Sequence, residues 1–364
     1  MKILLTSGIY PPDIGGPASY VPKLSRAFRS EGHQTTVVSL KPRTTGEINR
    51  DSETLLVNRG FLPMRIFKTI SQIVFRAISV DRIFSNGLYI ESAIAARITG
   101  TPSVAKIVGD PLWERKRNNG KTSQSIAEFQ TSRLTFLDKC FRGMYRLAFN
   151  SFSVITTPSE ELARVIRGWG VKPQVIVIPN GVEIPDRIPT EKKYDLVYVG
   201  RLVKWKNVDI VIEITSQLGL RTAIIGSGPE LINLKEFALR LSANCEFLGD
   251  QEKGVIDQTL MASRLFILLS QYEGLSFALL ESMAAGITPI VSDAKGNLDV
   301  VTDGFNSLVA HLDNLQELPN QLQALLGDEL RMRTLGDNAL QTVKKKYLAS
   351  SRISDMIELT LSVR

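Results

Sequence analysis

Two glutamates, Glu273 and Glu281, are separated by seven residues that are all small or apolar. From Gly274 to Ser292 the sole charged residue is Glu281. A carboxylate among Leu, Ala and Met side chains is costly to bury unless it is paired or hydrogen-bonded. We therefore expect each glutamate to face a pocket or to bond a specific partner.

The segments around these glutamates predict such a pocket. Leu265–Leu269 is typical of a buried strand, and Tyr272–Ser276 of a turn that contains glycine. Phe277–Ala285 is typical of a helix that ends at Gly286. Glu273 would then follow the carboxyl end of a strand, where ligands bind in open α/β sheets. The backbone N–H groups at the helix start suit a phosphate, and they belong to Gly274, Leu275, Ser276 and Phe277.

Two cations lie at a second strand end, in the segment YVGRLVKWKN. Arg201 follows the strand, and Lys206 comes five residues later at the start of a helix. Cations at such an edge would neutralise a diphosphate and stabilise it as a leaving group. The alternative is a solvated basic turn, and the glutamates expected at the same edge make that alternative less favourable.

A pair of glycines, Gly15 and Gly16, follows the first strand and precedes a helix that starts near Pro17. Without side chains there, backbone amides can approach a phosphate or a sugar closely. The alternative is a simple turn between strand and helix.

The order of segments predicts two α/β domains. A length of 364 residues suffices for two cores. Strand-like and helix-like segments alternate, which favours parallel sheets covered by helices. The polar run Glu183–Asp195 contains Pro185 and Pro189 and is typical of a linker. We predict domains at 1–183 and 195–345, a hinge at 184–194, and a C-terminal helix at 346–364 that crosses back to the first domain.

The predicted strands of the first domain are Lys2–Thr6, Gln34–Ser39, Arg82–Phe84, Ser103–Ile107, Val154–Thr157 and Val175–Ile178. Those of the second domain are Leu196–Val199, Thr222–Ile225, Cys245–Leu248, Leu265–Leu269 and Thr288–Ser292. We also expect a long helix around Ser125–Phe149 and loops at Pro42–Glu53 and Arg115–Gln124. Two doubly wound sheets joined by one hinge would face a central cleft, a favoured place for a substrate.

Composition indicates a cytoplasmic protein. Cys140 and Cys245 lie in different halves, which argues against a disulfide framework and suits a reducing compartment. The apolar run of MKILLTSGIYPPD is cut short by Pro11 and Pro12, as expected of a first strand rather than a signal peptide. No stretch of about 18 apolar residues is present to span a membrane.

Positive charge is concentrated in the first half. Residues 1–183 contain 25 Lys and Arg against 14 Asp and Glu, a balance of +11. The remainder contains 19 against 23, a balance of −4. Such asymmetry indicates that the first half faces an anionic surface or substrate. The alternative is a basic domain with no such partner.

Two segments of this half combine apolar positions with cations, GFLPMRIFKTISQIVFRAI and RLTFLDKCFRGMYRLAF. The second has apolar residues at helical spacing, namely Leu134, Leu137, Phe141, Met144 and Ala148. Basic amphipathic helices can lie on anionic lipid, although such a stripe is more often the core face of a helix. The charge balance favours a substrate that is lipid-linked or presented at the cytoplasmic face of a membrane, with peripheral membrane contact through this domain.

These segments together resemble the retaining glycosyltransferases of family 4, which have the GT-B fold. The resemblance covers nearly the whole chain and is carried by E-x7-E together with GR-x4-K. Further matching segments are PPDIGG, TTPSE, VIPNGV, VGRLVKWKN, IGSGPE and YEGLSFALLESMAAG. The family implies an α/β structure with two Rossmann-like, doubly wound domains that face a central cleft.

The resemblance also implies a role for each matching residue. Glu273 would contact the donor sugar, and Glu281 would hydrogen-bond the ribose of the nucleotide. Arg201 and Lys206 would hold the diphosphate.

The backbone amides of Gly274–Phe277 and the N-terminal loop at Gly15 and Gly16 would add to this hold on the diphosphate. The family implies no metal and no other cofactor, since cations and helix dipoles can replace a metal's charge. The sequence agrees with that expectation, because it lacks clustered His, Cys or DxD-type ligands.

One departure concerns the first domain, where many family members place a His at the mouth of the cleft. This chain has His33 just ahead of a strand and His311 in the second domain. At the expected place, in AKIVGDPLWERKRNNG, Asp110 follows a strand and is our candidate for that position. It would accept a hydroxyl proton or bond a sugar hydroxyl; the alternative is a turn-forming Asp before Pro111. The candidates for shaping the acceptor entrance are Trp113, Glu114, Arg115 and Arg117.

We predict a retaining, metal-independent glycosyltransferase that uses a nucleotide-diphospho-sugar in polysaccharide, lipopolysaccharide or glycolipid synthesis. The candidate catalytic residues are Asp110, Glu273, Arg201 and Lys206. The expected partners are the donor and a lipid-linked or saccharide acceptor, with no nucleic acid. The alternatives are a nucleotide-sugar hydrolase or epimerase of the same fold, and a non-catalytic nucleotide-sugar-binding subunit.

Overall fold

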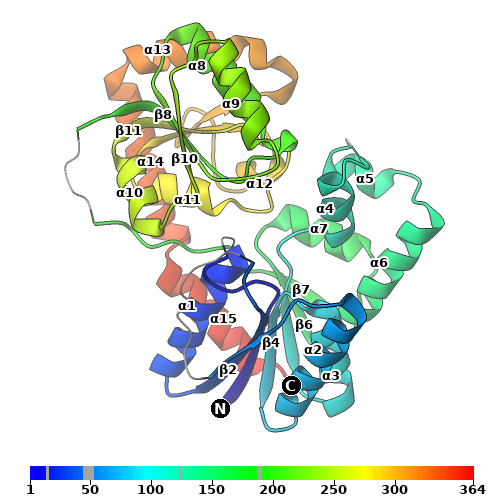
Figure 1. Cartoon of the computed structure of the whole chain (residues 1–364). Helices are drawn as coiled ribbons and strands as arrows, with labels where there is room; N and C mark the ends of the chain where they lie inside the picture. The colour runs from blue at the N-terminus through cyan, green and yellow to red at the C-terminus, as the bar shows by residue number, and fades with distance from the viewer. Residues whose placement is uncertain (14–15, 44–52, 123, 187–190) are drawn as a thin grey trace. The chain divides into compact units, whose positions relative to one another are not determined.

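The computed structural model describes residues 1–13, 16–43, 53–122, 124–186 and 191–364, with Ala127 described by its backbone alone. These residues form two compact units, drawn in Figure 1. The first unit comprises Met1–Pro179 and Arg352–Arg364, and the second comprises Asn180–Ser351. Each unit is built on one parallel sheet covered by helices, which confirms the predicted doubly wound α/β architecture.

In the described part of the first unit, seven strands form a sheet in the order β3-β2-β1-β4-β5-β6-β7. The strands are β1 Lys2–Ser7, β2 Gln34–Leu40, β3 Thr54–Val57, β4 Arg82–Asn86, β5 Ser103–Lys106, β6 Val154–Thr157 and β7 Gln174–Val177. Leu5 of β1 pairs with Val37 of β2 and with Phe84 of β4. The order reverses between β1 and β4, which brings their carboxyl ends to a crevice at one edge.

The helices of this unit cover both faces of the sheet. They are α1 Gly16–Ser30, α2 Leu62–Ala77, α3 Tyr89–Thr99, α4 Pro111–Asn118, α5 Ile126–Thr131, α6 Phe136–Phe149, α7 Glu160–Gly168 and α15 Ala349–Ser362. Successive strand residues point to opposite faces. Leu5 and Phe84 accordingly pack with residues of α1 and α15, and Leu4 packs with Ile73 of α2 and Ala95 of α3.

In the second unit the described strands form a sheet in the order β10-β9-β8-β11-β12-β13. They are β8 Tyr194–Val199, β9 Thr222–Ile225, β10 Cys245–Gly249, β11 Ser263–Leu268, β12 Thr288–Ser292 and β13 Leu308–Ala310. The α-helices are α8 Val208–Leu218, α9 Leu231–Arg240, α10 Lys253–Met261, α11 Phe277–Ala284, α12 Lys295–Leu298, α13 Leu318–Gly327 and α14 Glu329–Lys346. Two 3-10 helices are η1 Lys204–Lys206 and η2 Leu312–Glu317.

Two strands, β3 and β13, were not among the predicted segments. Both lie at a sheet edge and are short, at four and three residues. An edge strand pairs with one neighbour alone, so a few residues suffice to form it. A segment this short shows little of the alternating apolar pattern by which a strand is predicted. The predicted loop at Pro42–Glu53 and the predicted hinge both extend into ranges outside the described residues.

The predicted long helix at Ser125–Phe149 is wrong, because the structure has two helices there. Ser125 and Glu128 form a capping box at the start of α5, and Thr135 and Asp138 form another at the start of α6. A cap fixes a new helix start, so the chain cannot continue as one helix through Thr135. The predicted loop at Arg115–Gln124 is also wrong in part, since its first four residues belong to α4. No helix in the described ranges is both long and apolar enough to cross a bilayer.

Candidate active site

The first part of the site is the segment that follows β8. Arg201 is exposed just beyond the strand end, and Lys206 is the last residue of η1. The next residue, Asn207, adopts the left-handed conformation with φ of 51°. Its side-chain amide donates a hydrogen bond to the carbonyl oxygen of Leu269 at 2.9 Å. The turn that carries Lys206 is therefore fixed to the loop after β11.

That loop carries Glu273, and the two segments meet at its carboxylate. The backbone N–H of Gln271 donates to the carbonyl oxygen of Trp205 at 2.8 Å. The Lys206 ammonium forms an ion pair with Oε1 of Glu273. The Ser270 hydroxyl donates to the same oxygen at 2.6 Å. The Lys206 and Glu273 side chains are only 15% and 10% exposed. A nearly buried carboxylate thus has the cation and the hydrogen bond that its burial requires.

Tyr198, on β8, links the same cluster to Arg201. Its phenol is fully buried, and burial first, then the negative charge of Glu273, raises the pKa of Tyr198 well above its ordinary value. The phenol therefore stays neutral and donates a hydrogen bond to the backbone carbonyl oxygen of Arg201 at 3.1 Å. This bond holds the backbone of the segment from which the guanidinium projects.

The start of α11 lies next to Glu273. Ser276 is the N-cap, and its hydroxyl accepts a hydrogen bond from the backbone N–H of Leu279 at 3.3 Å. The side-chain amide of Asn180 donates to the carbonyl oxygen of Leu275 at 3.1 Å. These bonds order Gly274–Phe277, the predicted phosphate-binding amides, at the positive end of the helix dipole.

Sequence analysis did not identify Gly296 as part of this site. A Cβ atom at that position would lie 1.9 Å from the carbonyl oxygen of Glu273, so α12 packs directly on the Glu273 loop. No residue other than glycine permits this contact without displacement of the loop. A glycine between Lys295 and Asn297 gives no signal in the sequence, because the contact joins residues more than twenty positions apart.

Glu281 on α11 also has a partner that the sequence did not reveal. Its Oε1 lies 3.4 Å from the ammonium nitrogen of Lys253, the first residue of α10. Lys253 also forms an ion pair with Asp257 one turn later. A cation is therefore available next to the carboxylate predicted to bond a ribose.

The loop after β9 supports the segment that carries Arg201. Gly226 has φ of +131°, and a Cβ atom there would lie 2.0 Å from the carbonyl oxygen of Gly200. A Cβ atom at Gly228 would lie 2.1 Å from the carbonyl oxygen of Leu202. The two glycines in IGSGPE thus allow close packing of two strand-end loops.

In the first unit, the geometry of Asp110 is that of a helix cap. Its Oδ1 accepts hydrogen bonds from the backbone N–H groups of Leu112 and Trp113 at 2.9 and 3.0 Å. Its Oδ2 accepts from the Gln130 amide at 2.8 Å, and the residue is 0% exposed. Burial raises the pKa of Asp110, and these hydrogen bonds oppose that rise. Both oxygens of Asp110 are bonded within the protein, as is typical of an Asp that forms a turn before a helix.

A different carboxylate lies beside the end of β5. A Cβ atom at Gly109 would lie 1.7 Å from Oε1 of Glu114, so this carboxylate occupies the space that a side chain at position 109 would fill. Glu114 is partly exposed. Burial raises the pKa of Tyr89 and of Tyr145, and the negative charge of Glu114 adds to that rise. Glu114, rather than Asp110, is thus the more accessible acid at this strand end.

The other acceptor-side candidates have unequal exposure. Trp113 is 1% exposed, and its indole N–H donates to the carbonyl oxygen of Gln124 at 3.0 Å. Arg117 donates to the same oxygen at 3.1 Å and lies over the Trp113 ring. Both therefore brace the segment after α4. Arg115 is exposed, with its guanidinium carbon 4.7 Å from the centre of the Phe141 ring.

The remaining predicted residues are placed as follows. Gly15 lies outside the described residues, and Gly16 is the first residue of α1. His33 lies 3.1 Å from the N-terminal amine, and His311 lies 3.1 Å from Asp293. Within the described ranges, no group of three or more His, Cys, Asp or Glu side chains is placed to hold a metal ion.

Two family models match this chain, and together they cover most of its length. The model of Glycosyltransferase Family 4 matches residues 14–185, and that of Glycosyl transferases group 1 matches residues 183–342. An uncharacterized glycosyltransferase of Methanocaldococcus jannaschii is 24% identical over 95% of this chain and 94% of its own. An Escherichia coli UDP-Gal:alpha-D-GlcNAc-diphosphoundecaprenol alpha-1,3-galactosyltransferase is 25% identical over 74% of this chain and 72% of its own.

Among solved structures, HepE of Anabaena in complex with UDP and glucose has the same fold. It superimposes with a TM-score of 0.81 at 19% identity, and the match covers 100% of both chains. The two doubly wound units and the matched models define a GT-B glycosyltransferase that acts on nucleotide sugars. Within that class, the chain belongs to glycosyltransferase family 4.

Proposed function

We propose that this enzyme is a retaining, metal-independent transferase that moves a hexose from a nucleotide-diphospho-sugar to a lipid-linked saccharide. The observation that carries the proposal is the Lys206–Glu273 ion pair, held at the carboxyl edge of the second sheet beside the start of α11. Hydrogen bonds between the two segments that carry the pair hold it in place, as electrostatic catalysis requires.

The donor would bind along this edge. Arg201, Lys206 and the amides of Gly274–Phe277 together offer two cations and a helix N-terminus to the diphosphate. Glu273 would accept a hydrogen bond from a hydroxyl of the donor sugar. Glu281, with Lys253 beside it, would bond the ribose.

The transfer step needs no side-chain base. The acceptor hydroxyl oxygen forms a bond to the anomeric carbon as the bond from that carbon to the diphosphate oxygen breaks. The hydroxyl proton passes to the departing phosphate oxygen on the same face of the sugar, so the anomeric configuration is kept. Lys206 and Arg201 would stabilise the negative charge that develops on the diphosphate. The burial of Asp110 supports this route, because a carboxylate that is 0% exposed and already accepts three hydrogen bonds is poorly placed to take a proton from an acceptor hydroxyl.

The first unit would hold the acceptor, and we assign Glu114 to it as a hydrogen-bond acceptor for a sugar hydroxyl. The relative from Escherichia coli acts on a diphosphoundecaprenol-linked sugar and uses UDP-Gal, which supports a lipid-linked acceptor and a uridine nucleotide here. The basic first half supports an acceptor presented at an anionic membrane surface.

The test is incubation with UDP-, GDP- and ADP-hexoses and short polyprenyl-diphosphate-linked sugars, followed by mass analysis. We expect one donor to give an extended acceptor, with EDTA without effect and the donor's anomeric configuration kept in the product's NMR spectrum. Free hexose alone would indicate a hydrolase, and an isomerised donor an epimerase. Nucleotide-sugar binding with no product in any mixture would indicate a binding subunit.

A further inference from the structure

Helix α2 carries a row of large apolar side chains on its outer face. Its inner face is buried, with Thr69, Ile73 and Ala77 against the sheet. The outer row, here called the α2 stripe, is 54%, 68%, 74% and 73% exposed at Met64, Phe67, Phe75 and Ile78. The spacing of these four residues places them on one side of the helix. Phe61 and Leu62 at the helix start are exposed as well. So large an exposed apolar row marks an interaction surface.

Helix α6 has a second such row. Phe141, Tyr145 and Phe149 form ring contacts with one another on its inner side. The outer row, here called the α6 stripe, is 79%, 77%, 43% and 68% exposed at Phe136, Leu137, Met144 and Leu147. Helix α3 packs against both α2 and α6. The two stripes therefore belong to one layer of helices.

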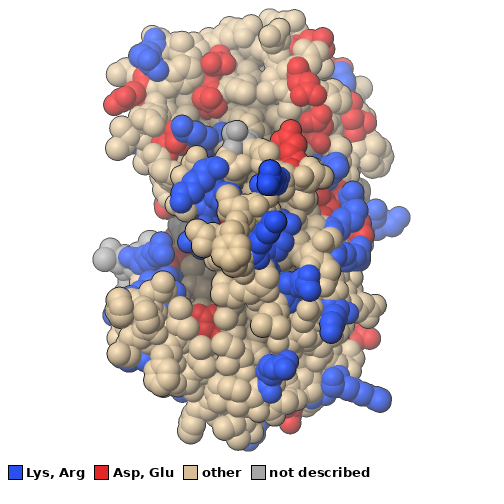
Figure 2. Space-filling model, turned by 90° about the vertical axis from the view of Figure 1, so that its right-hand side faces the viewer, with Lys and Arg blue, Asp and Glu red and all other residues tan. Residues whose placement is uncertain are grey.

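The charges around both stripes are positive. The α2 sequence contains Arg65, Lys68 and Arg76 and no acid. The α6 sequence contains one acid, Asp138, and this carboxylate is bonded to Lys116 and to the cap residue Thr135. Lys139 and Arg146 of α6 are exposed, as is Arg133 just before it. Figure 2 shows Lys and Arg side chains across the middle of this face of the molecule, with Asp and Glu side chains mainly toward the top of the view.

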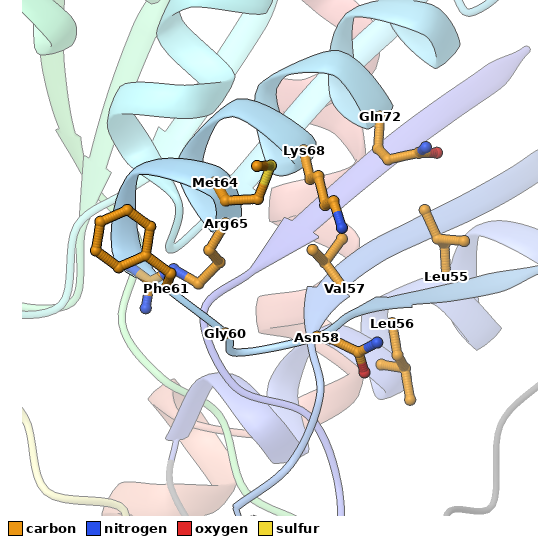
Figure 3. A pocket seen from close by; sticks show the side chains of 10 residues that line it. All are labelled: Leu55, Leu56, Val57, Asn58, Gly60, Phe61, Met64, Arg65, Lys68 and Gln72. Atoms are coloured by element: carbon orange, nitrogen blue, oxygen red, sulfur yellow. The ribbon is translucent and has the colours of Figure 1, made fainter.

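A pocket of about 340 Å³ lies between α2 and the end of β3, here called the α2 pocket. Its polar lining includes Asn58, Lys68 and Gln72, and its apolar lining includes Leu55, Val57 and Phe61. In Figure 3 the side chains of Lys68 and Gln72 extend from α2 toward the residues of β3. A cation and two amides beside an apolar rim suit an amphiphile with a phosphate head.

We propose that the α2 stripe, the α6 stripe and the α2 pocket form a docking surface for a bilayer that contains anionic phospholipid. The stripes enter the boundary between head groups and acyl chains, and the surrounding cations bind the head groups. The α2 pocket takes one phosphate head group, with Lys68 as its counter-ion. A second copy of the chain is a poorer occupant, since its own cations would meet those of the first.

This surface deepens the proposed function, because a docked first unit would meet an acceptor embedded in the bilayer. Docking itself needs neither donor nor turnover. Its failure can therefore be distinguished from failure of the transferase assignment.

The experiment is co-sedimentation of the whole protein with vesicles of phosphatidylcholine alone or with 30% phosphatidylglycerol. We expect binding to the anionic vesicles, weakened by salt, and little binding to the neutral ones. The double variant Phe67→Ser/Phe75→Ser should bind about 10-fold more weakly or worse, because each change removes a large inserted side chain. Lys68→Gln should weaken binding to anionic vesicles alone.

The matched control is Ile232→Ser/Leu239→Ser, which removes two apolar side chains of α9 that are 70% and 81% exposed in the other unit. It should bind vesicles like the parent. All variants should keep the parent's affinity for UDP. The F67S/F75S variant should transfer to a water-soluble acceptor at the parent's rate. It should lose transfer to an acceptor embedded in vesicles. Absence of vesicle binding by the parent, equal binding to neutral vesicles, or a dimer that F67S/F75S dissolves would each overturn the proposal.

Discussion

Each unit has a lysine of low exposure and a buried carboxylate near the carboxyl edge of its sheet, and their partners differ between the units. In the second unit Lys206 and Glu273 are paired with each other. In the first, Lys106 ends β5 and lies 4.3 Å from the centre of the Tyr20 ring, with no hydrogen-bond partner for its nitrogen among the described residues. Asp110, four residues later, is bonded to backbone amides instead.

We propose that the pair in the second unit is functional and that Lys106 and Asp110 in the first unit are structural. A buried pair that is joined to neighbouring loops and adjacent to exposed Arg201 can exchange its partner for a substrate group. A capping carboxylate cannot leave its amides without loss of the helix start. In the part of the chain that the structure describes, Lys106 has only the face of the Tyr20 ring near its ammonium, and burial without a counter-ion lowers its pKa.

The largest effect is expected for Lys206→Met. Without the ammonium, the developing charge on the diphosphate loses a stabilising cation, and kcat/KM for transfer should fall on the order of 100- to 1000-fold. Lys206→Arg should recover part of the rate and keep Glu273 paired, and Lys235→Met, an exposed lysine on α9, should behave like the parent. A normal rate for Lys206→Met in a steady-state transfer assay would show that Lys206, like Lys106, is not needed for transfer.

Lys106 should make the free energy of unfolding depend on pH. Burial lowers the pKa of Lys106 to about 7 from its usual 10.5. The unfolded chain therefore binds more protons between these values, and the destabilisation is fully present below pH 7 and relieved as the pH rises toward 10.5.

Lys106→Met should accordingly stabilise the protein at pH 6, and its advantage should shrink by about 2 to 3 kcal/mol at pH 9. Urea unfolding at both pH values measures this, with Lys41→Met as the exposed control. A difference between parent and variant that does not change with pH would show that burial does not lower the pKa of Lys106.

Asp110→Ala tests the capping role. Loss of the cap should lower the free energy of unfolding by about 1 to 2 kcal/mol. Asp110→Asn keeps an oxygen for the two backbone amides but loses the bond from Gln130, so it should lose less stability than Asp110→Ala. Chemical denaturation compares the two, and an equal loss in both variants would mean that the charge or the Gln130 bond, rather than the cap, matters.

Gly109→Ala tests the placement of Glu114 and should have the smallest effect. The new methyl group needs the space of the Glu114 carboxylate, so that side chain must move. We expect KM for the acceptor to rise about 10-fold or less, with donor affinity unchanged, as for loss of one hydrogen bond. Gly143→Ala, which has no atom within 4 Å of the added carbon, is the control. A change in donor affinity alone would contradict the assignment of Glu114 to the acceptor.

Sequence reasoning worked best where chemistry is concentrated in one segment. The run from Gly274 to Ser292 leaves Glu281 as its only charge, and Arg201 and Lys206 belong to one short motif. Lys253 and Gly296 could not be assigned in the same way, because the packing of α10 brings Lys253 to Glu281 and the packing of α12 brings Gly296 to the Glu273 loop.

Asp110 shows a second limit. A capping Asp and a catalytic Asp both follow a strand and precede a helix, so the local sequence is the same for either. Two features that the local sequence does not reveal distinguish them: the burial of the Asp110 side chain and the hydrogen bond from Gln130, twenty residues later.

The α6 periodicity shows a third limit. Helical spacing groups Leu137, Phe141, Met144 and Ala148 on one stripe, yet Phe141 and Ala148 face inward while Leu137 and Met144 are exposed. A helix that is apolar over a wide arc does not reveal which part of that arc meets the core.

The most direct test of this account compares Glu273→Gln with Asp110→Asn in one transfer assay, with UDP affinity and unfolding measured for both. Each change removes the charge of one buried carboxylate at a sheet edge. We predict a loss on the order of 100-fold or more for Glu273→Gln and a rate within about 2-fold of the parent for Asp110→Asn. The reverse order, or equal rates, would contradict the claim that the second unit's ion pair carries the chemistry.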